Sequence, residues 1–256
     1  MGVKGRFSEL KSIFGLSLSL AKANFKLRNE GSYLGIFWYL LEPLFLFGII
    51  LYLQPYFSSG SIQKYPLYLL IGLIIFNFFS QATNLAVNSI SGNKKFLTSM
   101  KIRKEVLVLS SFFQTIFSHF FEIIILIIFL IIYRHNLVSF AYYPIVFIIL
   151  GFFTLGACFI LATLGAFVND IQNVWRVISR LLWFATPIFY VLREPINFIF
   201  YFNPLYYYIT LVRTLILGNV YPYLFLIFMA IFMGLISFII GICIFNKYKN
   251  KFAEVV

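Results

Sequence analysis

Charged residues are scarce in this chain of 256 amino acids: they make up 11% of it, against about 25% in a soluble protein. Hydrophobic residues make up 62%, and the mean hydropathy is +0.94. One soluble core cannot hide so much apolar surface, so the composition excludes a soluble protein. Long polar segments are also lacking, which leaves no room for a soluble domain. We therefore expect an all-α integral membrane protein with a single membrane domain over residues 1–256.

Cysteine is rare, and no N-terminal signal sequence is visible. Cys158 and Cys243 both lie inside apolar runs, which argues against a disulfide framework and favours two buried thiols. The first ~30 residues carry several basic side chains and no early apolar run, unlike a cleavable signal peptide.

Residues that perform catalysis or bind metals are few. His119 and Glu122 are three positions apart and could share a helix face, but one histidine and one carboxylate do not make a metal site. The sequence contains neither an HExxH motif nor a GxSxG elbow. A membrane enzyme such as an acyltransferase or lipid phosphatase would need a cluster of His, Asp or Glu near an interface. His119, Glu122 and Asp170 do not visibly converge, so we expect no catalytic residues and no metal.

A phosphate-binding P-loop is also missing, because no glycine in the chain is followed by lysine. We therefore expect no cofactor on this chain. If ATP powers its activity, a separate subunit must bind the ATP and Mg²⁺ and hydrolyse the nucleotide.

Long apolar runs predict the membrane topology, since a crossing needs about 20 apolar residues. We expect six transmembrane helices, near residues 33–53, 66–90, 106–132, 142–166, 177–193 and 223–245. If the N-terminus is cytoplasmic, 16 basic residues lie inside and 4 outside. The positive-inside rule then places both termini of this multi-pass protein on the cytoplasmic side of the cytoplasmic (inner) membrane. The net charge of +12 is thus explained by orientation and contact with membrane lipids, not by nucleic acid.

The first 30 residues have a helical pattern of their own. Apolar residues recur at steps of three or four, at Phe7, Leu10, Phe14, Leu18, Ala21 and Phe25. This spacing predicts an amphipathic helix lying in the inner membrane interface. A helix packed on a partner is the alternative interpretation.

Polar residues form stripes along four of the predicted spans. The members are Arg28, Ser32, Gly35, Tyr39 and Glu42; Asn77, Gln81, Asn84 and Asn88; Ser111, Gln114, Ser118 and Glu122; and Arg176, Ser179 or Arg180, Trp183, Thr186 and Tyr190. Polar stripes in a membrane face protein or water, so spans one, two, three and five could surround a polar path. Each stripe could instead hold helices together. Spans four and six carry faces of small residues, which allow close helix packing; the members are Gly151, Thr154, Cys158, Ala162 and Gly165, and Gly234, Ser237 and Gly241.

The segment from Phe184 to Gly218 is apolar but interrupted by prolines and charges. Beyond the fifth span it contains two short apolar pieces, Ile196–Phe202 and Leu205–Leu217, separated by Asn203-Pro204. Neither piece is long enough to cross, so we expect re-entrant or interfacial helices on the outer side, within residues 194–222.

Four stretches resemble the membrane subunit of ABC-2 type exporters, in particular the polysaccharide-exporting branch. They are KLRNEGSYLGIFWYLLEPL (Lys26–Leu44), MKIRKEVLVLSS (Met100–Ser111), FVNDIQNVWRVISRLLWFATPIFY (Phe167–Tyr190) and FNPLYYYITLVRTLILG (Phe202–Gly218). They occur in order over nearly the whole chain. Where the family usually has Arg-Asp, this chain has Asn169-Asp170, so no role of that arginine is transferred.

The resemblance implies a homodimer with two copies of a nucleotide-binding ATPase subunit beneath it. It also implies a cytoplasmic coupling helix between spans two and three, which by position falls on Asn93–Lys101. The candidate coupling residues are Asn93, Lys94, Lys95, Phe96, Leu97 and Lys101.

In the polysaccharide branch, a lipid-linked glycan passes through a channel at the dimer interface, where aromatic rings can stack on sugar rings. Our candidates for lining this channel are Tyr39, Glu42, Trp183 and Tyr190. For an outer gate they are Asn203, Pro204, Tyr206 and Arg213.

The expected function is therefore export of a lipid-linked cell-surface polysaccharide, with O-antigen, and so lipopolysaccharide biosynthesis, as the first candidate. Teichoic acid, capsule, or a small molecule or drug are alternative cargoes. An integral-membrane enzyme and a passive channel remain as alternatives of a different class; a passive channel would need no ATPase partner.

Overall fold

The computed structural model describes residues 3–30, 33, 35–57, 64–94, 103–190, 192, 198–218 and 223–252. These residues form α-helices joined by short 3₁₀ turns. The α-helices are α1 (Val3–Asn29), α2 (Trp38–Phe57), α3 (Tyr65–Val87), α5 (Lys104–Ile132), α6 (Tyr143–Phe167), α7 (Ile171–Ala185), α8 (Pro204–Leu217) and α9 (Tyr223–Tyr248). The 3₁₀ turns are η1 (Gly35–Phe37), η2 (Ser91–Asn93), η3 (Leu137–Tyr142), η4 (Phe198–Phe202) and η5 (Lys249–Lys251). The described chain is therefore all-α, as expected.

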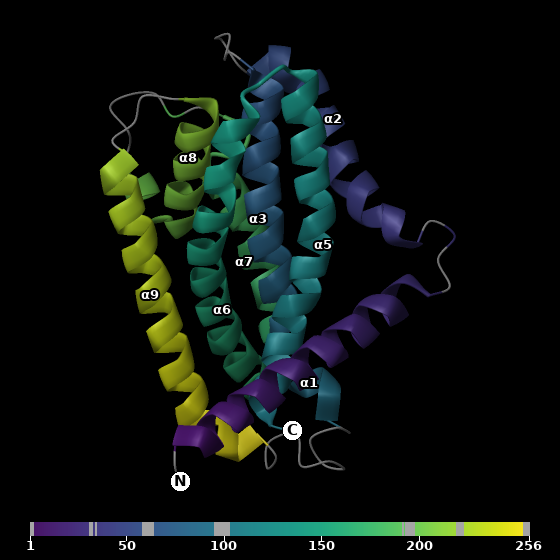
Figure 1. Cartoon of the computed structure of the whole chain (residues 1–256), viewed down its shortest axis with the longest axis vertical. Helices are drawn as coiled ribbons and strands as arrows, with labels where there is room; N and C mark the ends of the chain where they lie inside the picture. Colours follow the sequence, from purple (N-terminus) through teal and green to yellow (C-terminus); the bar gives the residue numbers. More distant parts are fainter. Residues whose placement is uncertain are drawn as a thin grey trace.

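Four helical segments of the described chain are long and apolar enough to cross a membrane. They are Tyr65–Val87, Lys104–Ile132, Leu137–Phe167 and Tyr223–Lys251. They coincide with the predicted spans two, three, four and six, which confirms these four as long apolar helices. The chain is thus a multi-pass membrane protein. Both termini lie at one end of the molecule (Figure 1).

The first and fifth predicted spans differ from the other four. α2 has 20 residues and contains Pro43 and Pro55. α7 begins earlier than expected and has only 15 residues, because it ends just before Thr186-Pro187. A residue that precedes proline is forced out of the helical region, and Thr186 is accordingly extended. The fifth span is therefore a short helix followed by an irregular segment.

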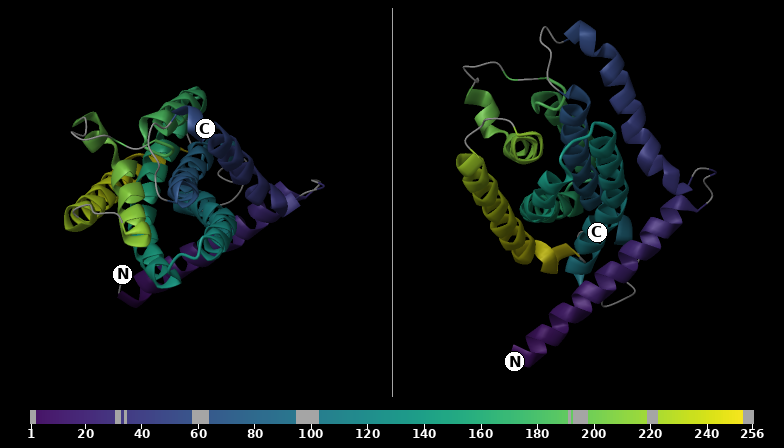
Figure 2. Two further views of the ribbon diagram at one scale, coloured as in Figure 1. Left: turned by 90° about the horizontal axis from the view of Figure 1, so that it is seen from above. Right: turned by 45° about the horizontal axis from the view of Figure 1, so that its top comes forward.

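α3 is the central helix. It contacts α2, α5, α6, α7 and α8, and most of its apolar stretch is buried. α9 lies at the edge of the molecule beside α6 and α8 (Figures 1 and 2). The core therefore surrounds α3, and the peripheral helices leave apolar side chains facing outward, as lipid contact requires.

Small residues let α6 approach two neighbours closely. A Cβ on Gly165 would lie 2.1 Å from the carbonyl oxygen of Val87 in α3. A Cβ on Gly156 would lie 2.3 Å from backbone atoms of Ser237 in α9, and one on Gly241 would meet Gly156 equally closely. The predicted small faces thus make close contacts, and Gly156, which the prediction left out, also lies directly against the α9 backbone.

α1 crosses the other helices obliquely near the end that holds the termini (Figures 1 and 2). It packs on α5 through edge-to-face pairs of Phe14 with Phe113 and of Phe25 with Phe117, at 5.0 and 5.8 Å between ring centroids. Ala21, between these contacts, is fully buried. One side of the N-terminal helix is therefore covered by the chain's own third span.

Candidate functional site

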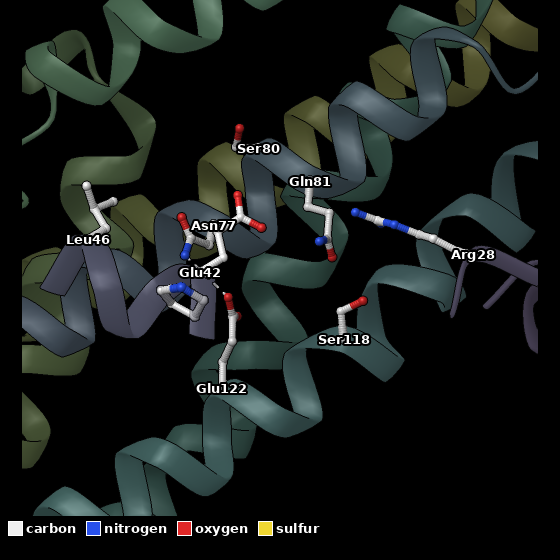
Figure 3. Close-up of a pocket in the computed structure, with 9 residues that line it drawn as sticks. Arg28, Glu42, Leu46, Asn77, Ser80, Gln81, Ser118 and Glu122 are labelled. Atoms are coloured by element: carbon white, nitrogen blue, oxygen red, sulfur yellow. Dashed lines mark hydrogen bonds between the residues drawn. The ribbon is translucent and has the colours of Figure 1, made fainter. Parts of the chain in front are cut away.

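A polar pocket with a volume of about 410 Å³ lies where α2, α3 and α5 meet the end of α1. Its side chains come from all four helices (Figure 3). They are Arg28, Glu42, Pro43, Leu46, Asn77, Ser80, Gln81, Ser118 and Glu122. We call this the α2/α3/α5 pocket.

The helical spacing of the sequence explains why these side chains meet. Asn77 and Gln81 are four residues apart on α3, and Ser118 and Glu122 are four apart on α5, so each pair shares one helix face. Glu42 reaches the same space from α2 (Figure 3). Members of the polar stripes predicted for spans one, two and three thus converge on one pocket.

Glu122 is held from two sides. Its Oε2 lies 2.8 Å from Nδ1 of His119, and its Oε1 accepts a hydrogen bond of 3.3 Å from Nδ2 of Asn77. Nε2 of His119 lies 2.7 Å from the hydroxyl of Tyr143 on α6. All of these contacts are satisfied when Nδ1 carries the histidine proton and Tyr143 donates to Nε2. The carboxylate at the pocket wall is therefore fixed in orientation.

Aromatic rings lock this arrangement in place. The ring of His119 stacks on Phe147 at 4.7 Å with an interplanar angle of 6°, and Phe78 lies 4.9 Å away. His119 is only 1% exposed. Among the described residues, no group of three His, Cys, Asp or Glu side chains is placed to hold a metal ion. The described residues of the pocket can therefore bind a ligand through hydrogen bonds and charged groups.

The fourth stripe, on α7, reaches the edge of this site. The hydroxyl of Ser179 lies 2.9 Å from that of Ser80, which lines the pocket. Trp183, in the last turn of α7, and Tyr190, beyond the end of that helix, instead lie among other aromatic rings. Trp183 stacks on Phe189 at 5.1 Å, and the Tyr190 hydroxyl donates to the carbonyl of Phe184 at 3.0 Å.

The four candidate channel residues therefore occupy different places. Glu42 lines the pocket, whereas Trp183 and Tyr190 lie with the aromatic rings that follow α7. The side chain of Tyr39 is outside the described part of the structure. Glu42 shares the pocket with three other members of the predicted stripes, Asn77, Gln81 and Ser118.

Arg213 on α8 binds the irregular segment after α7. Its Nε donates to the carbonyl of Tyr68 at 3.0 Å, and its Nη1 and Nη2 donate to those of Pro187 and Ile188 at 2.7 and 2.6 Å. The guanidinium also lies 3.4 Å from the centre of the Tyr68 ring. Arg213 is 3% exposed, so a buried cation joins α3, α8 and the end of α7.

Asn203 ties the start of α8 to the same segment. Its Nδ2 donates to the hydroxyl of Thr186 at 2.8 Å, and its Oδ1 accepts from the backbone N–H of Leu205 at 3.0 Å. It is thus the N-cap of α8, and Pro204 follows at the first helical position, where a missing N–H costs little. Tyr206 is buried one turn further on.

Two tyrosines on α3 complete the contacts. The hydroxyl of Tyr65 donates to the carbonyl of Phe189 at 2.7 Å, and that of Tyr68 donates to the carbonyl of Tyr190 at 3.1 Å. Side chains therefore satisfy the carbonyls of four successive residues, 187–190, at a place where no helix does so. We call this set of contacts the α7–α8 clasp. Three of its residues, Asn203, Pro204 and Arg213, belong to the candidate outer gate.

The opposite end, near the termini, is held by ion pairs. Glu9 on α1 pairs with Arg103, and Lys249 lies 2.5 Å from Glu105 on α5. Lys104 donates to the carbonyl of Lys249 at 2.7 Å. Residues on α1, α5 and η5 are thus connected where α5 begins.

Of the candidate coupling residues, Asn93 and Lys94 follow α3 at this same end. The side chain of Asn93 donates to the carbonyl of Ser89 at 2.9 Å. Lys95, Phe96, Leu97 and Lys101 lie outside the described residues.

Comparison with known proteins identifies the family. The family description "ABC-2 type transporter" matches residues 16–217, which is well over half of the chain. The chain belongs to the ABC-2 type transporter family. This ABC-2 chain is therefore a transmembrane transport subunit, and family membership implies that it pairs with an ATPase subunit that uses ATP. The resemblance drawn from the four sequence stretches is confirmed.

Relatives of this ABC-2 subunit carry more specific names. Two proteins from Klebsiella pneumoniae named "O-antigen export system permease protein RfbA" are 27% and 26% identical to it, with full coverage of both chains. A protein of the same name from Myxococcus xanthus is 27% identical over 72% of this chain and 71% of its own length.

Proposed function

We propose that this chain is the membrane permease of an ATP-driven exporter of a lipid-linked cell-surface polysaccharide, with O-antigen as the first candidate cargo. The observation that carries the proposal is the end-to-end similarity to two O-antigen export permeases. Teichoic acid, capsule and small molecules are less favoured because the relatives are named for O-antigen export.

The proposed topology has six crossings within one transmembrane domain over residues 1–256. An α-helix rises about 1.5 Å per residue, so the 20 residues of α2 reach about 30 Å, the thickness of the hydrocarbon core. α7 reaches about 22 Å, and the irregular segment that follows it continues toward the far end. α8 is short, buried and flanked by turns, which supports a re-entrant helix within residues 194–222 on the outer side.

Two copies of the chain form the proposed glycan channel between them, with Tyr39, Glu42, Trp183 and Tyr190 as lining residues. Two ATPase subunits dock at the cytoplasmic end against Asn93–Lys101. The N-terminal helix, residues 1–30, lies at the inner interface. Support for this orientation comes from the positive-inside rule, because 16 of the 20 basic residues fall on the inner side when the N-terminus is cytoplasmic.

The proposed outer gate is formed by Asn203, Pro204, Tyr206 and Arg213, and three of these residues belong to the α7–α8 clasp. Its support is that a buried cation and an N-cap fix an irregular backbone segment at the end away from the termini. Crosslinking this segment between the two copies should block export, and undiminished export would remove the gate assignment.

The proposal is tested by deleting the gene in its host and staining surface polysaccharide with a specific lectin or antiserum. We expect surface polymer to disappear while lipid-linked polymer accumulates inside the cell, and a plasmid copy to restore the surface signal. Normal surface polymer in the deletion strain would refute the proposal.

A further inference from the structure

We propose that the α2/α3/α5 pocket binds single sugar units of the exported polymer and favours neutral or amine-bearing sugars over acidic ones. This inference rests on the proposed export function and adds to it a class of substrate. It concerns a pocket within each copy of the chain, which includes the channel candidate Glu42 and is separate from Trp183 and Tyr190.

The lining groups match the hydrogen-bonding needs of a sugar ring. A sugar hydroxyl both donates and accepts, so it needs partners of both kinds. Glu42 and Glu122 supply acceptors, Arg28 supplies donors, and the amides and hydroxyls from α3 and α5 supply both. These groups come from four helices and face one space, as Figure 3 shows.

The size and shape of the pocket also fit a small polar molecule. Its volume of about 410 Å³ falls within the range of small-molecule sites, roughly 300–1,000 Å³. Pro43 and Leu46 add an apolar wall, against which the C–H face of a sugar ring can lie. The pocket therefore combines a few placed polar groups with an apolar surface, as ligand sites commonly do.

One acceptor is held in place before any sugar arrives. Glu122 is bound by His119 and Asn77, and His119 is in turn fixed by Tyr143 and by stacking on Phe147. The Glu122 carboxylate is therefore oriented by His119 and Asn77. A group positioned in this way loses little freedom when it binds, which raises affinity.

The charges of the pocket set its preference. Among the described lining residues are two carboxyl groups and one guanidinium, so an acidic sugar would place its carboxylate beside Glu42 and Glu122. Like charges repel strongly at a few ångströms in a protein interior, whereas a neutral sugar is unaffected and an amine is attracted. The cargo of this permease should accordingly be a neutral or amino-sugar polymer.

The test uses the whole chain, purified with its ATPase subunit into lipid nanodiscs, and three sugars of nearly the same shape. Saturation-transfer NMR is recorded with galactose, galactosamine and galacturonate. We expect transfer to galactose and galactosamine, and affinity for galacturonate lower by about tenfold or more. Absence of transfer to galactose, or equal affinity for galacturonate, would overturn the inference.

Matched variants place the signal in the pocket. Gln81→Leu should abolish transfer to galactose, whereas Gln114→Leu, on the neighbouring helix and outside the pocket lining, should leave it unchanged. Glu42→Gln should raise galacturonate affinity about tenfold, whereas Glu30→Gln, which removes an exposed carboxylate, should not. Equal effects of a pocket variant and its control would also refute the site.

The two proposals fail in different ways. A chain that exports polysaccharide in cells but gives no sugar signal refutes only the pocket assignment. A deletion strain with normal surface polymer refutes the export function, whatever the NMR result.

Discussion

Arg213 shows how backbone carbonyls hold a buried charge. Its guanidinium donates to three backbone carbonyls, from Tyr68, Pro187 and Ile188, and lies against the Tyr68 ring. A planar cation with a rigid fork of donors can bind several carbonyls at once, and a lysine cannot do so with the same geometry. The irregular segment after α7 depends on this residue, because no helix pairs its carbonyls.

The first prediction replaces this arginine. Arg213→Lys keeps the charge but leaves at least one buried carbonyl unpaired, so we expect it to lower the free energy of unfolding by about 2–3 kcal/mol. The control is Arg176→Lys, because Arg176 is exposed on α7 and its substitution should change little. Thermal unfolding in detergent, followed by tryptophan fluorescence, measures both. Equal unfolding temperatures for the two variants would contradict the role of Arg213.

Gly72 tests the same contact from α3. A Cβ at Gly72 would lie 2.5 Å from Nη2 of Arg213 and 3.0 Å from the carbonyl oxygen of Ile188. Gly72→Ala should therefore destabilise the chain by about 1–3 kcal/mol through overpacking, despite the better helix propensity of alanine. At Gly48 on α2 an added Cβ meets nothing within 4 Å, so Gly48→Ala should be neutral or stabilising. A Gly72 variant as stable as the Gly48 variant would refute the close approach.

At the scale of the elements, regular helix spacing predicted the long helices and part of the site. The steps of four that separate Asn77 from Gln81 and Ser118 from Glu122 placed these residues on shared faces, and the structure brings both faces to one pocket. α7 was predicted too long because the apolar run continues through Thr186-Pro187. The proline at 187 ends the helix there.

Contacts between distant segments could not be predicted in the same way. Tyr143 binds His119 across 24 residues, and Arg213 binds carbonyls 25 and 26 residues away. No local pattern encodes which helix a side chain will face. Every residue has a backbone carbonyl, so the sequence does not indicate which carbonyls a distant side chain will bind. The predicted small face of α6 likewise contained residues of one helix face, from Gly151 to Gly165. Gly156 lies outside that set and packs on α9.

The third prediction concerns this helix pair. Gly156→Ala places a methyl group within 2.3 Å of the α9 backbone, so α9 must shift, and we expect a loss of about 2–3 kcal/mol of stability. At Gly151 an added Cβ would lie 3.6 Å from the Phe112 ring, an ordinary contact, so Gly151→Ala serves as the control. Thermal unfolding again distinguishes them. If the two alanine variants unfold together, the close α6–α9 packing is wrong.

At the scale of the whole molecule, the two ends differ in chemistry. The end with the termini carries ion pairs that join α1, α5 and η5, and the other end carries the α7–α8 clasp. The pocket lies between α2, α3 and α5, and α3 and α5 run from one end of the molecule toward the other. An ATPase docked at the end that holds the termini would therefore contact the same molecule near α3 and α5, two helices that also line the pocket.

The fourth prediction tests this docking. Reversing the charge of Lys94, Lys95 and Lys101 to glutamate should abolish the effect of the permease on the ATPase rate of its partner, because the proposed docking segment then carries the wrong charge. Lys11→Glu and Lys22→Glu, on α1, should preserve it. Full coupling in a stably folded triple variant would remove the docking role from this segment.

Reconstituted transport tests the central claim most directly. The chain, its co-purified ATPase subunit and lipid-linked polysaccharide from the host are reconstituted together in proteoliposomes. Added ATP then reaches only those ATPase subunits that face the outside. We predict that polymer becomes protected from an external glycosidase only when ATP can be hydrolysed. Protection that is independent of ATP, or no protection despite active hydrolysis, would contradict the account.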